Sequence, residues 1–175
     1  MPAYHKLLTL RVWTSAIAIV GVMQLSNAAW ADDNAKTKYG ITVTTCTFDY
    51  DDENFCADGR MQTFAKIMKV RQANFAKDRL LYIYKPKESY GYRMVSIDKS
   101  KQTVTPFYWS FREASQAVNS KGEKLVFDFD KATNEFCFKG NIGAYRNAYD
   151  YDSDNYPEFC FDYDKDKNAF GWFKQ

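Results

Sequence analysis

The chain contains one ten-residue pattern twice, first as Phe127-Asp128-Phe129-Asp130-Lys131-Ala132-Thr133-Asn134-Glu135-Phe136 and, 34 residues later, as Phe161-Asp162-Tyr163-Asp164-Lys165-Asp166-Lys167-Asn168-Ala169-Phe170. In each copy, alternating aromatic and polar residues lead into a short polar stretch, which is typical of two strands joined by a turn. An Asp that opens such a turn accepts backbone hydrogen bonds, and an Asn tolerates the left-handed conformation of tight hairpins. Each copy therefore predicts an antiparallel β-hairpin.

Weaker copies of the pattern extend this prediction to the whole chain. They are Phe48-Asp49-Tyr50-Asp51 with Asn54-Phe55-Cys56, and Ser96-Ile97-Asp98-Lys99-Ser100-Lys101. Hairpins of this kind build a sandwich or a small barrel, and as structural repeats they would build a propeller-like domain. We expect a mainly β fold of one of these three architectures, with one or two short helices.

Two segments predict the helices. The first begins at Asp58, a candidate cap, and places apolar residues near the helical period, although Lys66 to Val70 would also alternate as a strand. Its apolar residues are Met61, Phe64, Ile67, Met68 and Phe75. The second opens with a capping-box pattern, Ser110-Phe111-Arg112-Glu113, and continues from Ala114 to Val118.

Residues 1–31 have the pattern of a signal peptide. Lys6 and Arg11 precede an uncharged run from Val12 to Leu25, and the segment ends in Ala29-Trp30-Ala31, which matches the A-x-A site of a signal peptidase. The apolar run is too short to span a bilayer. We expect cleavage near Ala31 to release residues 32–175 as a single β-rich domain without a membrane anchor, either periplasmic or secreted.

The positive charge of the chain belongs to this leader. The whole sequence carries a net charge of +2, and Lys6 and Arg11 supply it, since the leader contains no acid. The remaining chain is balanced in charge. The basic isoelectric point therefore does not indicate a nucleic-acid partner.

Four cysteines lie after the leader, at positions 46, 56, 137 and 160. An even number in an exported chain predicts two disulfides. We expect Cys46–Cys56 and Cys137–Cys160, because each pair flanks one turn or loop. Cys137 and Cys160 also alternate with aromatic neighbours, so both lie on the polar faces of their strands and could meet across two neighbouring strands. The cysteine spacings do not fit a zinc site.

The one histidine, His5, lies in the leader. The remaining chain therefore has no Ser-His-Asp or Cys-His nucleophile, no histidine base and no histidine-ligated metal. A carboxylate pair, as in glycoside hydrolysis, stays open. We expect a protein that is not an enzyme and that uses no cofactor.

The stretch from Gly140 to Glu158 is long for a connection between two paired strands, and long loops are often functional. The expected Cys137–Cys160 disulfide closes its base. Tyrosine and arginine are typical anchors of protein interfaces. We predict the partner-binding residues Tyr145, Arg146, Tyr149, Asp150, Tyr151, Asp152, Asp154 and Tyr156, with tyrosines packed under the loop as the alternative.

The same stretch invites a calcium interpretation. Three acids match positions 1, 3 and 5 of an EF-hand loop: Asp150, Asp152 and Asp154. Asn155 replaces the required Gly and Phe161 the required Glu, so the EF-hand is rejected. A looser calcium site on these three acids, or on the cluster from Asp49 to Glu53, remains an alternative to no metal at all.

These features favour a non-catalytic binding protein of the cell envelope. The leading hypothesis is an inhibitor or immunity protein that blocks a cell-wall-degrading enzyme or toxin, because acidic loops suit the cleft of a cationic enzyme. The alternative is a surface or secreted adhesion module that binds a glycan or a host protein, with or without calcium.

Overall fold

The computed structural model describes residues 34–48, 53–87, 89, 91–144, 149–151 and 157–174. The expected leader, residues 1–31, lies outside them. No helix in the described ranges is long and apolar enough to cross a membrane.

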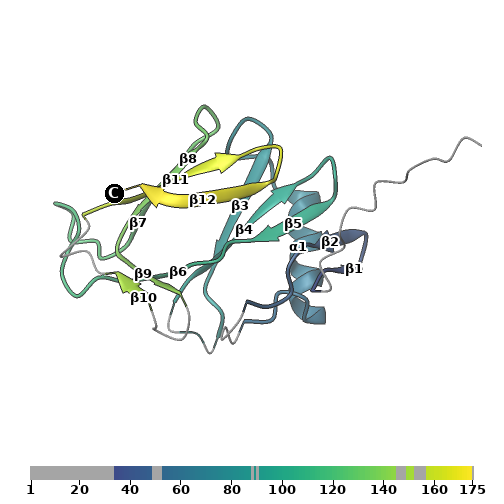
Figure 1. Ribbon diagram of the computed structural model, residues 1–175, viewed down its shortest axis with the longest axis horizontal. Coiled ribbons are helices and arrows are strands. Elements are labelled where there is room, and N and C mark those ends of the chain that lie inside the picture. Colours follow the sequence, from purple (N-terminus) through teal and green to yellow (C-terminus); the bar gives the residue numbers. More distant parts are fainter. Residues whose placement is uncertain are drawn as a thin grey trace, which may run out of the picture.

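The fold is mainly β, as predicted, and its described strands form three sheets without a closed barrel (Figure 1). The largest sheet has the order β1-β2-β5-β4-β3. Its strands are β1 (Lys36–Lys38), β2 (Ile41–Val43), β3 (Arg79–Tyr84), β4 (Arg93–Asp98) and β5 (Thr103–Pro106). β2 and β5 run parallel, while the other described pairings are antiparallel.

Two smaller sheets contain the remaining strands. The four-stranded sheet has the order β12-β11-β8-β7 and consists of β7 (Val126–Asp128), β8 (Glu135–Lys139), β11 (Phe159–Asp164) and β12 (Ala169–Lys174). The three-stranded sheet has the order β10-β9-β6 and consists of β6 (Ser110–Arg112), β9 (Asn141–Ala144) and β10 (Tyr149–Tyr151).

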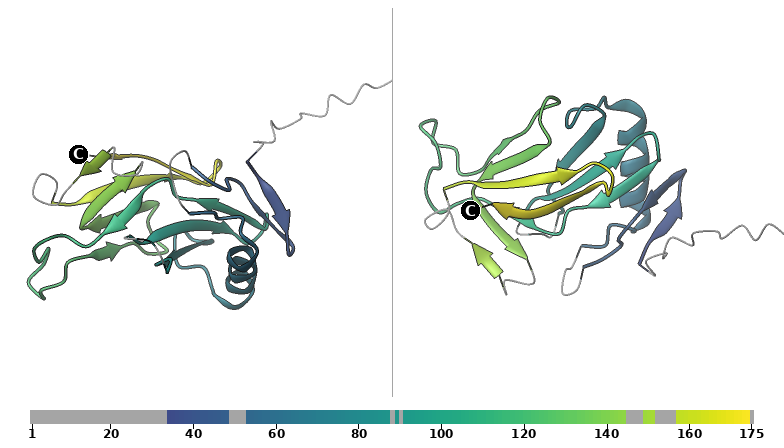
Figure 2. Two further views of the ribbon diagram at one scale, coloured as in Figure 1. Left: turned by 90° about the horizontal axis from the view of Figure 1, so that it is seen from below. Right: turned by 45° about the horizontal axis from the view of Figure 1, so that its top comes forward.

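The central strand β4 of the five-stranded sheet is buried on both faces, whereas the edge strand β1 is exposed. The helix α1 (Asp58–Val70) covers one face, and the strands β11 and β12 cross the other (Figure 2). Along β4 the side chains alternate between the two cores, so that Met94 packs with the aromatic residues of the four-stranded sheet and Val95 packs with α1. This double burial explains why β4 lacks the alternation of half-buried and buried residues seen in β8.

The turn chemistry expected from the repeated pattern is present. The Oδ1 atoms of Asp98, Asp130 and Asp164 each accept hydrogen bonds from the amides two and three residues further on. Asn168 has a φ of 51° and closes the β11–β12 hairpin. The pattern near Phe48 does not form a described hairpin, because neither Phe48 nor Asn54 to Cys56 belongs to a strand.

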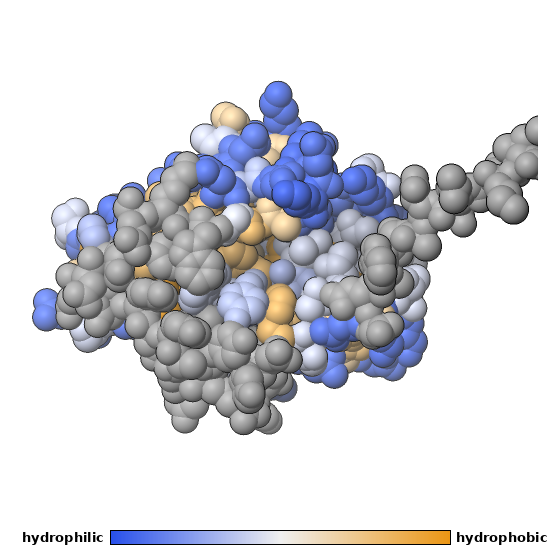
Figure 3. Space-filling model, viewed as in Figure 1, coloured by the Kyte–Doolittle hydropathy of each residue, from blue (hydrophilic) through white to orange (hydrophobic). Residues whose placement is uncertain are grey.

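These hairpin turns lie along one edge of the molecule, the upper edge in Figure 1. The space-filling view of the same face shows hydrophilic residues along this edge and apolar residues gathered in the middle of the face (Figure 3). The described turns are thus solvated, as their lysine and aspartate content predicts.

Both helix predictions need correction. The first helix is α1, but it ends at Val70, and Phe75 instead joins the aromatic core after forming a bridge with Arg79. Asp58 is not the cap: Ala57 takes that position, and the Asp58 carboxylate pairs with Lys38 at 2.8 Å.

The second predicted helix is wrong. Ser110 to Arg112 form strand β6, which pairs with β9. The reason is tertiary: Phe111 is fully buried, and its ring packs 4.7 Å from the ring of Phe138. Burial of this ring between sheets outweighs the local capping pattern.

Both predicted disulfides are confirmed. Cys46 bonds to Cys56, which lies next to α1, and Cys137 bonds to Cys160. The second pair joins directly opposite positions of β8 and β11. The alternation of Cys137 and Cys160 with aromatic neighbours therefore predicted that these two residues face each other.

Candidate binding surface

Residues 140–158, here called the clasped segment, leave and rejoin the four-stranded sheet at adjacent points. Strand β8 ends just before it and β11 begins just after it, with Phe138 opposite Phe159 and Cys137 opposite Cys160. The disulfide joins the two strands at the pair next to Phe138 and Phe159, three residues before the segment begins and two residues after it ends. Lys139 and Glu158 add an ion pair of 3.8 Å at its mouth. The two ends of the segment are therefore fixed by the sheet.

The expectation of one long connection without regular structure is wrong for part of this segment. Strand β9 pairs with β10 on one side and with β6 on the other. Ile142 explains this pairing, because its side chain is fully buried in the aromatic core. Ser110 adds a hydrogen bond of 2.9 Å from its Oγ to the carbonyl of Gly143.

Gly140 allows the chain between β8 and β9 to pass close to Arg112 and Leu125. Its φ is +148°, and a Cβ at this position would lie 2.8 Å from the carbonyl oxygen of Arg112 and 2.6 Å from Cδ1 of Leu125. A side chain at position 140 would therefore push β9 away from β6.

The structure places only some of the predicted interface residues. Tyr149, Asp150 and Tyr151 form β10, opposite Ala144, Gly143 and Ile142 respectively. The other predicted residues lie outside the described ranges: Tyr145, Arg146, Asp152, Asp154 and Tyr156. The interface and the calcium alternative stay predictions.

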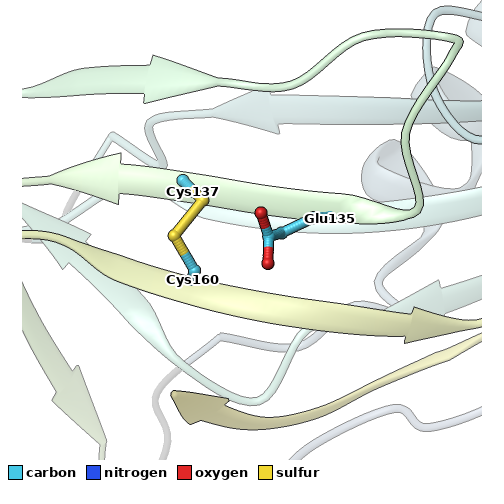
Figure 4. A group of neighbouring side chains, drawn as sticks. All are labelled: Glu135, Cys137 and Cys160. Atoms are coloured by element: carbon cyan, nitrogen blue, oxygen red, sulfur yellow. A yellow bond between two sulfur atoms is a disulfide. The ribbon is translucent and has the colours of Figure 1, made fainter. Parts of the chain in front are cut away.

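One group of potential metal ligands lies at the base of the clasped segment. Ligand atoms of Glu135, Cys137 and Cys160 lie within 4.8 Å of one another. The two sulfurs are bonded to each other (Figure 4), so neither can act as a thiolate ligand. The group is a disulfide with a neighbouring carboxylate and not a metal site.

An open pocket of about 340 Å³ lies beside the start of the clasped segment. It is lined by Tyr92, Glu113, Glu123, Lys124, Leu125 and Phe127. Leu125 connects the two features, because its Cδ1 lies against Gly140. Sequence reasoning missed this pocket, since its residues come from three separate stretches that no single motif joins.

The loop from Ala114 to Lys124 contributes Glu123 and Lys124 to the pocket lining. Its ends are closed by hydrogen bonds from the amide of Ala114 to the carbonyl of Lys124, at 2.8 Å, and from Val118 to Glu123, at 2.7 Å. Asn119 orders the tip, since its Oδ1 accepts from the amides of Lys121 and Glu123. The loop is therefore internally bonded.

A buried polar cluster joins the two stacked sheets, away from this surface. Arg79 on β3 is 4% exposed and forms an ion pair of 2.9 Å with Asp98 on β4. Its Nε donates to the hydroxyl of Tyr163 on β11 at 2.8 Å, and that hydroxyl donates to Asn168. The Ser96 hydroxyl lies within hydrogen-bond distance of both the Tyr163 hydroxyl, at 3.3 Å, and Oδ1 of Asn168, at 3.1 Å.

The charges of this cluster follow from its contacts. Burial alone would raise the pKa of Asp98, but hydrogen bonds from Ser100 and Lys101 and the charge of Arg79 outweigh it, so that the pKa is lowered. Burial raises the pKa of Tyr163, which stays a neutral donor. Oδ2 of Asp98 is held by the ion pair with Arg79 rather than by a hydrogen bond. The cluster connects the five-stranded sheet to β11.

A second ionisable cluster lies beside α1. Glu53 accepts a hydrogen bond of 3.0 Å from the Tyr84 hydroxyl and pairs with Nε of Arg60 at 2.8 Å. The Arg60 guanidinium also lies 4.2 Å from the centroid of the Tyr84 ring. Burial, followed by the negative charge of Glu53, raises the pKa of Tyr84 well above its ordinary value. This cluster ties residue 53 to the helix and to β3.

Comparisons of the chain with protein-family models, with curated proteins and with solved structures give no match.

Removal of the second disulfide tests how the clasped segment is held. In a C137S/C160S variant we expect the free energy of unfolding to fall by about 3 kcal/mol, because the bridge closes a loop of 23 residues. Urea denaturation measures this change. We also expect faster amide hydrogen exchange in β9 and β10 than in α1. The C46S/C56S variant is the matched control, and equal exchange of β9 in the two variants would contradict the prediction.

Proposed function

We propose that the protein is an exported, non-catalytic binding protein that blocks another protein of the cell envelope. The target class is a cell-wall-degrading enzyme or a toxin, so that the protein acts as an inhibitor or immunity protein. The observation that carries the proposal is the register-matched Cys137–Cys160 bridge, which fixes both ends of the clasped segment on one sheet. A recognition segment with fixed ends loses less conformational entropy when it binds.

The two disulfides support the expected compartment. Disulfides form and persist in oxidising environments, such as the bacterial periplasm and the extracellular space. Together with the leader pattern of residues 1–31, they favour a periplasmic or secreted protein.

The composition of the clasped segment supports a cationic protein as the target. The segment contains four tyrosines, one arginine and three aspartates between Tyr145 and Tyr156. Tyrosine and arginine supply anchor contacts, and a local excess of acids accelerates encounter with a basic cleft. We therefore expect the association rate to fall steeply as salt is added.

Capture from periplasmic extract tests the proposal. The tagged, disulfide-bonded protein is used as bait, and bound proteins are identified by mass spectrometry. We expect a basic envelope enzyme or toxin whose activity the purified protein inhibits. Specific retention of a glycan without any protein would reject the proposed inhibitor.

Single substitutions in β10 test the recognition surface. We expect Tyr149→Ala and Tyr151→Ala each to weaken binding of the captured partner by roughly 2 kcal/mol, with little change in stability. Calorimetry measures the affinity and urea denaturation the stability. Tyr39→Ala, at an exposed tyrosine of the β1–β2 turn, is the matched control. A loss of several kcal/mol of stability with affinity intact would show that these tyrosines pack inside the protein.

A further inference from the structure

The pocket beside the clasped segment combines aromatic and charged side chains in two separate zones. Tyr92, Leu125 and Phe127 are half-buried and give it an apolar floor, while Glu113, Glu123 and Lys124 are exposed at its rim. A ligand that fills such a pocket needs one apolar face and several polar groups around its edge.

The pocket lining carries two carboxylates, Glu113 and Glu123, and one ammonium, Lys124. Lys85 is not part of the lining, but its Nζ lies 5.3 Å from the centroid of the Tyr92 ring and adds a second positive charge nearby. These two negative and two positive charges cancel, so the site has no net charge that would favour an ionic ligand. The rim instead offers strong hydrogen-bond acceptors and donors, and groups of both kinds suit a neutral ligand with many hydroxyls.

Both zones are fixed by contacts outside the pocket. The Phe127 ring packs 5.3 Å from the Phe111 ring, and Nδ2 of Asn119 donates to Oε2 of Glu123 at 2.5 Å. The loop from Ala114 to Lys124 is closed at its base by the hydrogen bond between these two residues. A ligand would therefore find floor and rim in place, which lowers the entropic cost of binding.

We propose that this pocket binds one neutral hexose or N-acetylhexosamine unit of a cell-envelope glycan. The C–H face of the sugar ring packs on Tyr92, and its hydroxyls bond to Glu113, Glu123 and Lys124. The size agrees with this ligand, because about 340 Å³ lies near the lower end of the range for small-molecule sites. The site is separate from the proposed protein interface, and it would hold the protein at the wall on which its target acts.

Titration followed by amide NMR tests the proposal, with the N-acetylglucosamine trisaccharide and maltotriose as the two probes. We expect saturable shifts for at least one probe, confined to residues 91–92 and 113–127. Glu113→Gln should lower the affinity at least tenfold. Asp166→Asn removes one charge from the exposed β11–β12 turn and should leave the affinity unchanged.

Tyr92→Ala is the second variant, and its folding is checked by the dispersion of its amide spectrum. It should also lose at least tenfold in affinity. Absence of saturable shifts with both probes, shifts centred elsewhere, or unchanged affinity in Glu113→Gln would each overturn the sugar site. None of these results bears on capture of a protein partner, so the two proposals fail separately. Cleavage of either probe would instead show a catalytic carboxylate pair and overturn the binding-only assignment.

Discussion

Replacement of Arg79 by Ala is expected to lower the free energy of unfolding by about 3–5 kcal/mol. Arg79 is almost fully buried and contacts Asp98, Tyr163 and the carbonyl of Lys165. Its removal leaves the Asp98 carboxylate, which is 0% exposed, without its cation. Chemical denaturation measures the change.

Asp78→Asn is the matched control for this prediction. Asp78 pairs with the same guanidinium at 3.0 Å, but its side chain is 54% exposed. Exposed ion pairs contribute at most about 1 kcal/mol, so this variant should stay close to wild type. Equal losses in the two variants would contradict the role assigned to the buried pair.

Acid unfolding gives this prediction a second readout. The pKa of Asp98 is lowered in the folded protein from its ordinary value of 3.8. Its contribution to stability is therefore present above pH 3.8 and disappears as the pH falls through the lower, folded value. Without the positive charge of Arg79, the folded pKa rises, and we expect Arg79→Ala to unfold at a higher pH than wild type.

Phe136→Ala is expected to lower the free energy of unfolding by about 4 kcal/mol. The Phe136 ring is fully buried at the centre of the aromatic core, within 6.4 Å of several other rings. These rings belong to Phe107, Phe111, Phe127, Phe129, Phe138, Phe161 and Phe170. The cavity left by the ring cannot close without moving strands of two sheets.

Phe48→Ala is the matched control for the core prediction. Phe48 is half-buried at the periphery of the other core, where its ring packs edge-on against Phe55 and Tyr108. We expect a clearly smaller loss of stability, measured by the same denaturation curves. A loss at Phe48 as large as at Phe136 would contradict the central role of the aromatic core.

Local sequence chemistry predicted the parts of the fold that depend on neighbours in the chain. Asp130, Asp164 and Asn168 indicated the turns of two hairpins, and the position of Cys137 and Cys160 between aromatic residues indicated a shared strand face. Each of these features is determined by residues of a single turn or of two neighbouring strands. The structure confirms them because tertiary packing reinforces the same local preferences.

Features that depend on distant partners could not be predicted in this way. Ser110 to Arg112 carry a helix-capping pattern but form a strand, since Phe111 packs against residues far along the chain. Arg79 has no sequence signal of burial, because its partners Asp98 and Tyr163 are set by the stacking of two sheets. The candidate pocket was missed for the same reason, as its walls come from separate segments.

The parallel pairing of β2 with β5 joins two strands that lie far apart in the chain. Thr42 and Val43 lie opposite Thr103 and Val104, so β2 has no partner on this side until a strand some sixty residues further along the chain has reached the same compartment. Until then its edge is open to pairing with other chains. Cys46 and Cys56 are only ten residues apart and can bond early, next to the start of α1. A chain interrupted before β5 would therefore hold its first disulfide but expose an incomplete sheet, which makes such fragments prone to aggregate.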